Sequence, residues 1–279
     1  MTAIVDGLGI PRTTAATVML TLSTFCLGYL LTWGASYIVK LKKRRLYRKS
    51  LKIIITDFLN SCEKQYLEFE NFFSQPGYLN GGNYTVSFAT SYSYNYLAKT
   101  DIVVFIENFS SIFHRNRAVE ISQLFEVVER VAAAKETLKR VSDFVQARYD
   151  ENFNTYNESL DNLRKGHDDI IFELVKGDRL TEPNGYQHNV LRIFSAWKNK
   201  GASTHINSTL SEIVDPIYQL ATTTATSMVS QNIINYTLKC RLAAENLRKH
   251  EEYLKETVAG SLRIHKDAVV DCSDFIKSW

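Results

Sequence analysis

Residues able to do chemistry are scattered through this sequence and form no recognisable site. The best cluster of metal-ligand residue types is His167, Asp168 and Asp169. Adjacent residues point to different faces of a helix, so one histidine with one or two carboxylates is a weak ligand set. The run His250-Glu251-Glu252 is likewise expected on a solvated helix face. We therefore predict no bound metal and no cofactor.

The motifs of the common enzyme classes are also absent from the sequence. It contains no GxxxxGK[ST] phosphate loop, no GxGxxG turn, no HExxH, no GxSxG and no protein-kinase signature set. Four cysteines, Cys26, Cys62, Cys240 and Cys272, are far apart and include no CxxC pair, which favours a reducing compartment. Cys62 and Cys240 fall on apolar helical stripes, where cysteine acts as a small hydrophobic residue. We predict that the protein is not an enzyme. A helical hydrolase whose scattered residues meet only in the fold is the alternative.

The elements that carry these residues begin with an uncharged N-terminal segment. Residues 15–39 contain no charged side chain in 25 positions. As a helix they would extend for roughly 37 Å at about 1.5 Å per residue, enough to cross a hydrocarbon core of about 30 Å. Trp33 and Tyr37 lie near one end, where aromatic rings favour the membrane interface. A cleaved signal peptide would instead need basic residues before a shorter apolar run. The pattern predicts an uncleaved signal anchor, a single transmembrane helix.

The distribution of basic residues around this segment predicts its orientation. Arg12 is the only basic residue before it, whereas eight follow it directly. These eight residues, which form the basic block, are Lys40, Lys42, Lys43, Arg44, Arg45, Arg48, Lys49 and Lys52. Because basic residues remain on the cytoplasmic side, we expect the N-terminus outside and the C-terminal domain in the cytoplasm, at the inner membrane in a bacterium. The block would also attract anionic lipid, at about 1 kcal/mol per basic residue.

Net charge beyond the basic block argues against a nucleic-acid partner. The whole chain carries +3, but from residue 53 onward it has 24 basic and 29 acidic residues. A body with this negative balance offers no electrostatic footprint for DNA or RNA. We predict four segments: a short extracytoplasmic tail (1–14), the transmembrane helix (15–39), a basic juxtamembrane segment (40–52) and a cytoplasmic helical domain (53–279).

Small residues recur on one face of the predicted transmembrane helix. Thr24, Gly28, Thr32 and Ser36 follow one another at intervals of four. Such a face lets two membrane helices approach closely, so it is our candidate association face for a homo-oligomer. The alternative is that the hydroxyl groups only bond to carbonyl oxygens of their own helix.

Apolar spacing predicts that the cytoplasmic domain is all-α. Apolar residues follow three- and four-residue steps from Tyr47 to Phe73, and the run from about 116 to 175 fills nine of thirteen a and d heptad positions. Its stripe is wider than that of a two-stranded coiled coil, which favours an antiparallel bundle of four to six helices, with long helices among them. Gly166 is expected to interrupt the long helix, and Asp215-Pro216 to start another as N-cap and first residue. Residues 84–96 fit helix or strand equally.

The function predicted from these features is protein–protein interaction at a membrane. Long apolar-striped helices and the lack of catalytic motifs favour a membrane-anchored scaffold, holding an unknown protein partner at the cytoplasmic face of the lipid bilayer. The small-residue face supports an alternative, an effector that oligomerises through its anchor and perturbs the bilayer.

Overall fold

The computed structural model describes residues 12–82, 85–88, 97, 115–177, 185–203, 205–224 and 228–277, and the fold is all-α as predicted. Three long helices dominate it: α2 (Arg12–Phe73), α5 (Arg115–Lys176) and α9 (Met228–Lys277). The shorter elements are the 3-10 turn η1 (Tyr78–Asn80), α6 (Tyr186–Asn199), α7 (Ile206–Thr209), the π-helical turn η2 (Leu210–Val214) and α8 (Asp215–Thr224). None of the described residues belongs to a β-strand.

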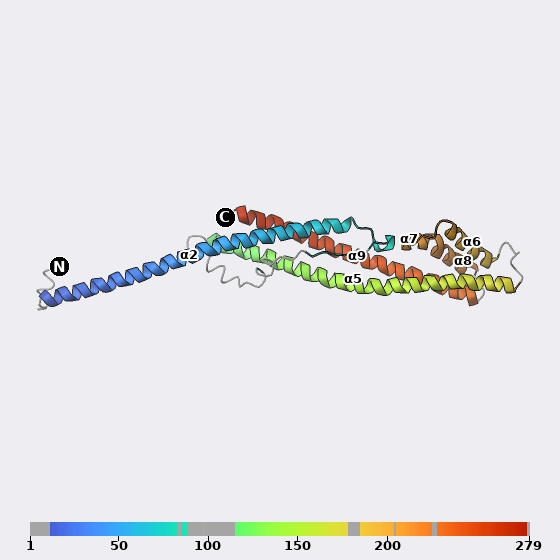
Figure 1. The fold of residues 1–279 in the computed structure, drawn as a ribbon, viewed down its shortest axis with the longest axis horizontal. Helices are drawn as coiled ribbons and strands as arrows, with labels where there is room; N and C mark the ends of the chain where they lie inside the picture. The colour runs from blue at the N-terminus through green and yellow to red at the C-terminus, as the bar shows by residue number, and fades with distance from the viewer. Residues whose placement is uncertain are drawn as a thin grey trace.

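The second part of α2 packs with α5 and α9 into an elongated three-helix bundle (Figure 1). Two core clusters show the direction of each helix. The first cluster contains residues 51–62 of α2, 121–131 of α5 and 268–275 of α9. The second cluster contains residues 69–72 of α2, 138–145 of α5 and 254–258 of α9. Residue numbers rise together in α2 and α5 and fall in α9, so α9 is antiparallel to both of the others. The predicted antiparallel bundle of long helices is confirmed.

Heptad positions of the predicted long helix form the core face of α5. Ile121, Val128, Leu138, Val145 and Leu163 are completely buried. The helix begins and ends within one residue of the predicted bounds, because an apolar stripe of this length has to be covered along its whole extent.

α2 continues without a break from the apolar segment into the bundle, as predicted. It ends at Phe73, shortly before Pro76 and Gly77, which cannot extend a helix well. The predicted stripe is wrong at both ends: Tyr47 is 46% exposed, and Phe73 is 42% exposed while its neighbour Phe72 is buried. Steps of three and four drift around a helix, so the sequence does not decide which of two adjacent phenylalanines faces the core.

A distal lobe covers the far end of the bundle. There α6, α7, η2 and α8 lie against the last part of α5 and the first part of α9 (Figure 1). Val190, Phe194 and Trp197 of α6 are buried in this lobe, which confirms the short helix predicted there. Ile213 and Ile217 bring the η2 and α8 segments into the same core.

Gly166 does not interrupt the long helix, contrary to expectation. α5 runs through it unbroken, and a Cβ atom at this position would lie 3.3 Å from Cγ1 of Ile233 in α9. The glycine therefore serves close helix packing, which local sequence cannot distinguish from a helix break.

Asp215 is not an N-cap either. Its φ and ψ of −67° and −44° are helical, and its carboxylate forms an ion pair with Arg241 at 2.9 Å. The π-helical turn immediately before Pro216 widens the backbone, which accommodates a residue without an N–H group inside a continuous helix.

Some predictions fall mainly outside the described residues. Of residues 84–96, only 85–88 are described, and these are neither helix nor strand. The apolar residues of 102–112 also recur at helical spacing in the sequence, and this segment lies wholly outside the described part of the chain.

Candidate functional site

The N-terminal part of α2 stands clear of the bundle (Figure 1). It is the one helix, among the described residues, that is long and apolar enough to cross a membrane. No residue in its most apolar stretch is buried, and Leu20, Phe25 and Leu31 are each at least 70% exposed. A core helix of a water-soluble protein would cover such side chains, so this half of α2 is a candidate membrane span that the rest of the fold leaves uncovered.

The basic block lies on α2 between this apolar part and the bundle. All eight residues are helical, and all but the half-buried Arg44 are exposed. Leu51, at the end of the block, is the first α2 residue in the core. The cationic side chains are therefore displayed at the level where a membrane surface would meet the bundle.

The candidate association face is open along its length. Thr24, Gly28, Thr32 and Ser36 are exposed, and a Cβ atom added at Gly28 would meet no atom within 4 Å. The hydroxyl of Thr24 donates to the carbonyl of Leu20 at 2.7 Å, and that of Thr32 donates to the carbonyl of Gly28 at 2.8 Å. The threonine hydroxyl groups are thus bonded within their own helix, and the face offers close approach more than hydrogen bonds.

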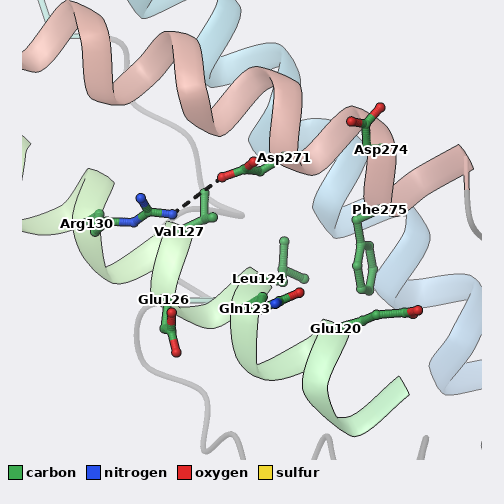
Figure 2. Close-up of a pocket in the computed structure, with 9 residues that line it drawn as sticks. All are labelled: Glu120, Gln123, Leu124, Glu126, Val127, Arg130, Asp271, Asp274 and Phe275. Atoms are coloured by element: carbon green, nitrogen blue, oxygen red, sulfur yellow. Dashed lines mark hydrogen bonds and ion pairs between the residues drawn. The ribbon is translucent and has the colours of Figure 1, made fainter. Parts of the chain in front are cut away.

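An open groove of about 520 Å³ lies between α5 and α9 near the basic-block end of the bundle (Figure 2). Leu124, Val127 and Phe275 are its apolar residues. Its polar residues are Glu120, Gln123, Glu126, Arg130, Asp271 and Asp274, of which Arg130 and Asp271 form an exposed ion pair at 3.4 Å. The described lining contains no histidine, cysteine or hydroxyl group, so it lacks the nucleophile–base pair of a hydrolase.

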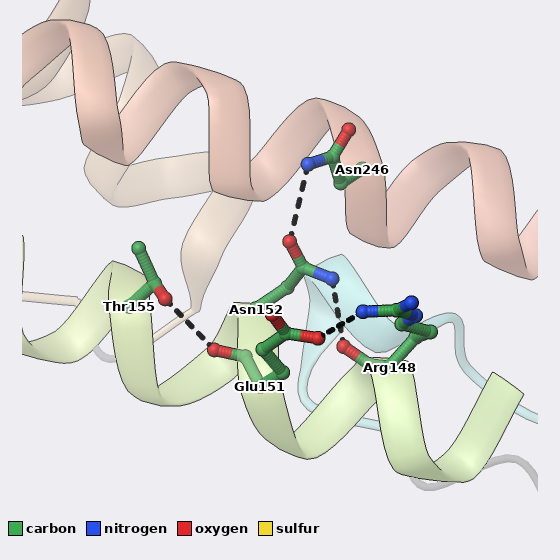
Figure 3. A network of polar contacts seen from close by, with 5 residues as sticks. All are labelled: Arg148, Glu151, Asn152, Thr155 and Asn246. Atoms are coloured by element: carbon green, nitrogen blue, oxygen red, sulfur yellow. Dashed lines mark hydrogen bonds and ion pairs between the residues drawn. The ribbon is translucent and has the colours of Figure 1, made fainter.

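A polar network joins α5 to α9 farther along the bundle (Figure 3). The Nδ2 atom of Asn246 donates to Oδ1 of Asn152 at 3.2 Å, and Asn152 donates in turn to the carbonyl of Arg148 at 2.7 Å. Arg148 also forms an ion pair with Glu151. Asn152 occupies one of the polar heptad positions of α5. A side-chain amide at such a position favours the one register in which it finds its partner.

The histidine–glutamate run of α9 is not a plain solvated face. The side chain of Glu251 is only 13% exposed; it accepts a hydrogen bond from the backbone N–H of Tyr78 at 2.9 Å and pairs with Lys255 at 2.7 Å. His250 stacks edge-on against Phe144, and burial lowers its pKa. Glu251 thus fastens the turn after α2 to α9, a contact between residues 173 positions apart that no local pattern reveals.

His265 is a buried histidine at the contact between α9 and α2. It lies on α9, stacks edge-on against Phe69 of α2, and its Nδ1 lies 2.8 Å from the carbonyl oxygen of Ser261. Burial lowers the pKa of His265, and the positive charge of Lys135 in α5 lowers it further. The hydrogen bond to Ser261 acts in the opposite direction and raises it. The ring and hydrogen-bond partners of His265 are an aromatic side chain and a backbone carbonyl, which places it as a core residue.

Three of the cysteines are unreactive because they are buried. Burial raises the pKa of Cys62, Cys240 and Cys272 to about 12, so they remain thiols at neutral pH. This agrees with the prediction that Cys62 and Cys240 act as small hydrophobic residues.

The predicted metal-ligand types do not converge. Nδ1 of His167 lies 2.9 Å from Oδ1 of Asp168, but the Asp168 side chain is 78% exposed and the His167 ring rests on Phe194. Within the described part of the chain, no three histidine, cysteine or carboxylate side chains come close enough to hold a metal ion.

Comparison with known proteins adds no further assignment. No family model, curated protein or solved structure matches this chain.

Proposed function

We propose that this protein is a single-pass membrane tether whose cytoplasmic rod holds partner proteins at a distance from the inner face of the membrane. The main support for this proposal is that α2 is one uninterrupted helix. Its first half is exposed and apolar, and its second half packs into the bundle core. A stiff helix that belongs to both surroundings couples the bundle directly to the bilayer.

The dimensions of the bundle favour a spacer role. At about 1.5 Å per residue, the 62 residues of α5 extend for roughly 90 Å. The distal lobe lies at the end of this rod away from the free half of α2 (Figure 1). Anchored in this way, the lobe would stand tens of ångströms from the lipid headgroups, within reach of partners that do not touch the membrane.

The basic block supports the cytoplasmic orientation of the rod. Eight basic residues flank the apolar segment on the bundle side, and Arg12 stands alone on the other. Their exposure on α2 also lets them contact anionic headgroups, each at about 1 kcal/mol.

Orientation can be measured with reporter fusions. A cytoplasm-active reporter placed after Trp279 should be active, and the chain should stay in the membrane fraction after alkaline extraction. Replacing the eight basic residues with glutamine should produce a mixture of orientations, whereas replacing eight exposed basic residues of α5 and α9 should not. Release of the wild-type chain by alkaline extraction, or glycosylation at Asn108 or Asn157, would contradict the tether.

A further inference from the structure

α2 carries a second apolar stripe that faces away from its own bundle. Val39, Leu46, Ile53 and Leu67 follow a spacing of seven, interrupted only by Asn60 at the remaining position. The four apolar side chains are exposed by 53, 66, 70 and 55%, and Asn60 is exposed as well. These five residues are called the outer stripe below. Isolated apolar residues on a surface are ordinary, but four of them at a seven-residue spacing along one helix fill one of the two apolar positions of a heptad repeat, the pattern of a helix–helix contact.

The outer stripe is distinct from the face that α2 buries in the bundle. The buried residues include Leu51, Ile55, Phe58 and Cys62. Successive residues of an α-helix are rotated by about 100° around its axis, which places Ile53 roughly opposite these buried residues. The helix is therefore two-sided, and α5 and α9 occupy only one side.

We infer that the outer stripe binds the same stripe of a second copy of this chain, in a parallel α2–α2 pair that extends from the membrane surface along the bundle. The inference rests on the proposed tether, because two anchors in one bilayer hold their α2 helices parallel and at equal height. In that arrangement each stripe residue meets its own counterpart, so the repeat of one chain fits the repeat of the other.

Asn60 indicates a second copy as the occupant. A single asparagine within an apolar heptad stripe pairs with another asparagine only when two parallel helices are in register. Its position between Ile53 and Leu67 would bring Asn60 of both copies together. An unrelated apolar partner would leave this amide against hydrophobic atoms, at the cost of an unsatisfied polar group.

The contact is narrow, and this explains why the membrane is needed. A heptad contact also needs apolar residues three positions after each residue of the stripe. These positions are polar here, as Lys49, Thr56 and Glu63 show. Lys42 and Lys49 would also bring like charges together, which anionic headgroups at that level offset. Confinement of both chains to one bilayer raises their effective concentration, so a weak stripe is sufficient.

Disulfide trapping in the full-length chain tests the pairing. Cys26→Ser removes the one cysteine that is exposed among the four, and the chain is reconstituted into vesicles of phosphatidylcholine and phosphatidylglycerol. Under mild oxidation, Leu46→Cys should give a disulfide-linked dimer in most of the protein. Tyr47→Cys is the matched control: it is 46% exposed and adjacent on the same helix, but off the stripe, and it should give at least five-fold less dimer.

A second variant distinguishes pairing through the outer stripe from pairing through the association face of the transmembrane helix. Ile53→Glu, combined with Leu46→Cys, should reduce cross-linking at least five-fold while the far-UV circular dichroism spectrum stays the same, because Ile53 supports no part of the bundle core. Equal cross-linking from Leu46→Cys and Tyr47→Cys, or cross-linking untouched by Ile53→Glu but abolished by Gly28→Ile, would overturn the inference. Membrane fractionation of the same samples reports separately on the proposed tether, since a chain that stays in membranes without cross-linking is a monomeric tether.

Discussion

The two halves of α2 have the same backbone structure and opposite relations to the rest of the protein. Phe25 in the first half is 73% exposed, whereas Phe58 in the second half is completely buried in the core that α2 shares with α5 and α9. Backbone hydrogen bonds are alike in both, so the difference lies in what covers the side chains. One helix can thus carry apolar side chains that the fold leaves open along one stretch and apolar side chains that tertiary packing covers along the next.

Disrupting the core of α5 that covers the second half of α2 should have the largest effect on the stability of the bundle. Leu138 of α5 is completely buried in the cluster that also holds Phe69 and Phe72 of α2. Leu138→Asp places a carboxylate there without a partner, which costs several kcal/mol, so the bundle should unfold. Thermal unfolding of the full chain in detergent, followed by circular dichroism, checks this. The variant should still fractionate with membranes, because the first half of α2 needs no bundle. An unchanged melting temperature would show that Leu138 is not in the core.

A matched pair of phenylalanines compares the two halves directly. Phe58→Ala should lower the free energy of unfolding by about 3–5 kcal/mol, the usual cost of emptying a phenylalanine site in a core. Phe25→Ala should leave it unchanged, because that ring contacts no residue of the bundle. Chemical denaturation of both variants in the same detergent measures the difference. Similar losses from both would mean that the first half of α2 also packs on protein.

Acid should weaken the second half of α2 through His265. Burial lowers the pKa of this histidine below its usual 6.5, so the unfolded chain takes up a proton at a pH where the folded chain does not. The stability that this contributes is complete above about pH 6.5 and is lost as the pH falls toward the folded-state pKa. The melting temperature of the wild type should therefore drop more between pH 7.5 and 5.5 than that of His265→Gln. Parallel curves for the two proteins would mean that His265 titrates normally.

The smallest effect is expected from the first half of α2. Gly28→Ile keeps this segment apolar, so membrane insertion and the stability of the bundle should not change. If the association face forms a contact, anchor self-association should fall, since helices approach closest where no side chain stands. Leu31→Ile, outside the association face, is the control. Equal association of wild type and Gly28→Ile in an assay on the isolated anchor would remove the support for a membrane-perturbing effector.

Sequence reasoning succeeded where the signal was a long stretch of uniform composition or regular spacing. The charge-free stretch of residues 15–39 marks a helix that is long and apolar enough to cross a membrane, and the seven-residue spacing from Ile121 to Leu163 marks the core face of α5. Both signals are periodic or compositional, so they survive without knowledge of the fold.

Contacts between remote segments were decided by the tertiary structure. The sequence does not show that Glu251 accepts a hydrogen bond from Tyr78, that Gly166 leaves room for Ile233, or that Phe72 rather than Phe73 faces the core. Each depends on how two helices are rotated and shifted against one another, and many pairs of side chains far apart in the chain contribute to that register. Local periodicity states that a face will be covered, and only packing decides what covers it.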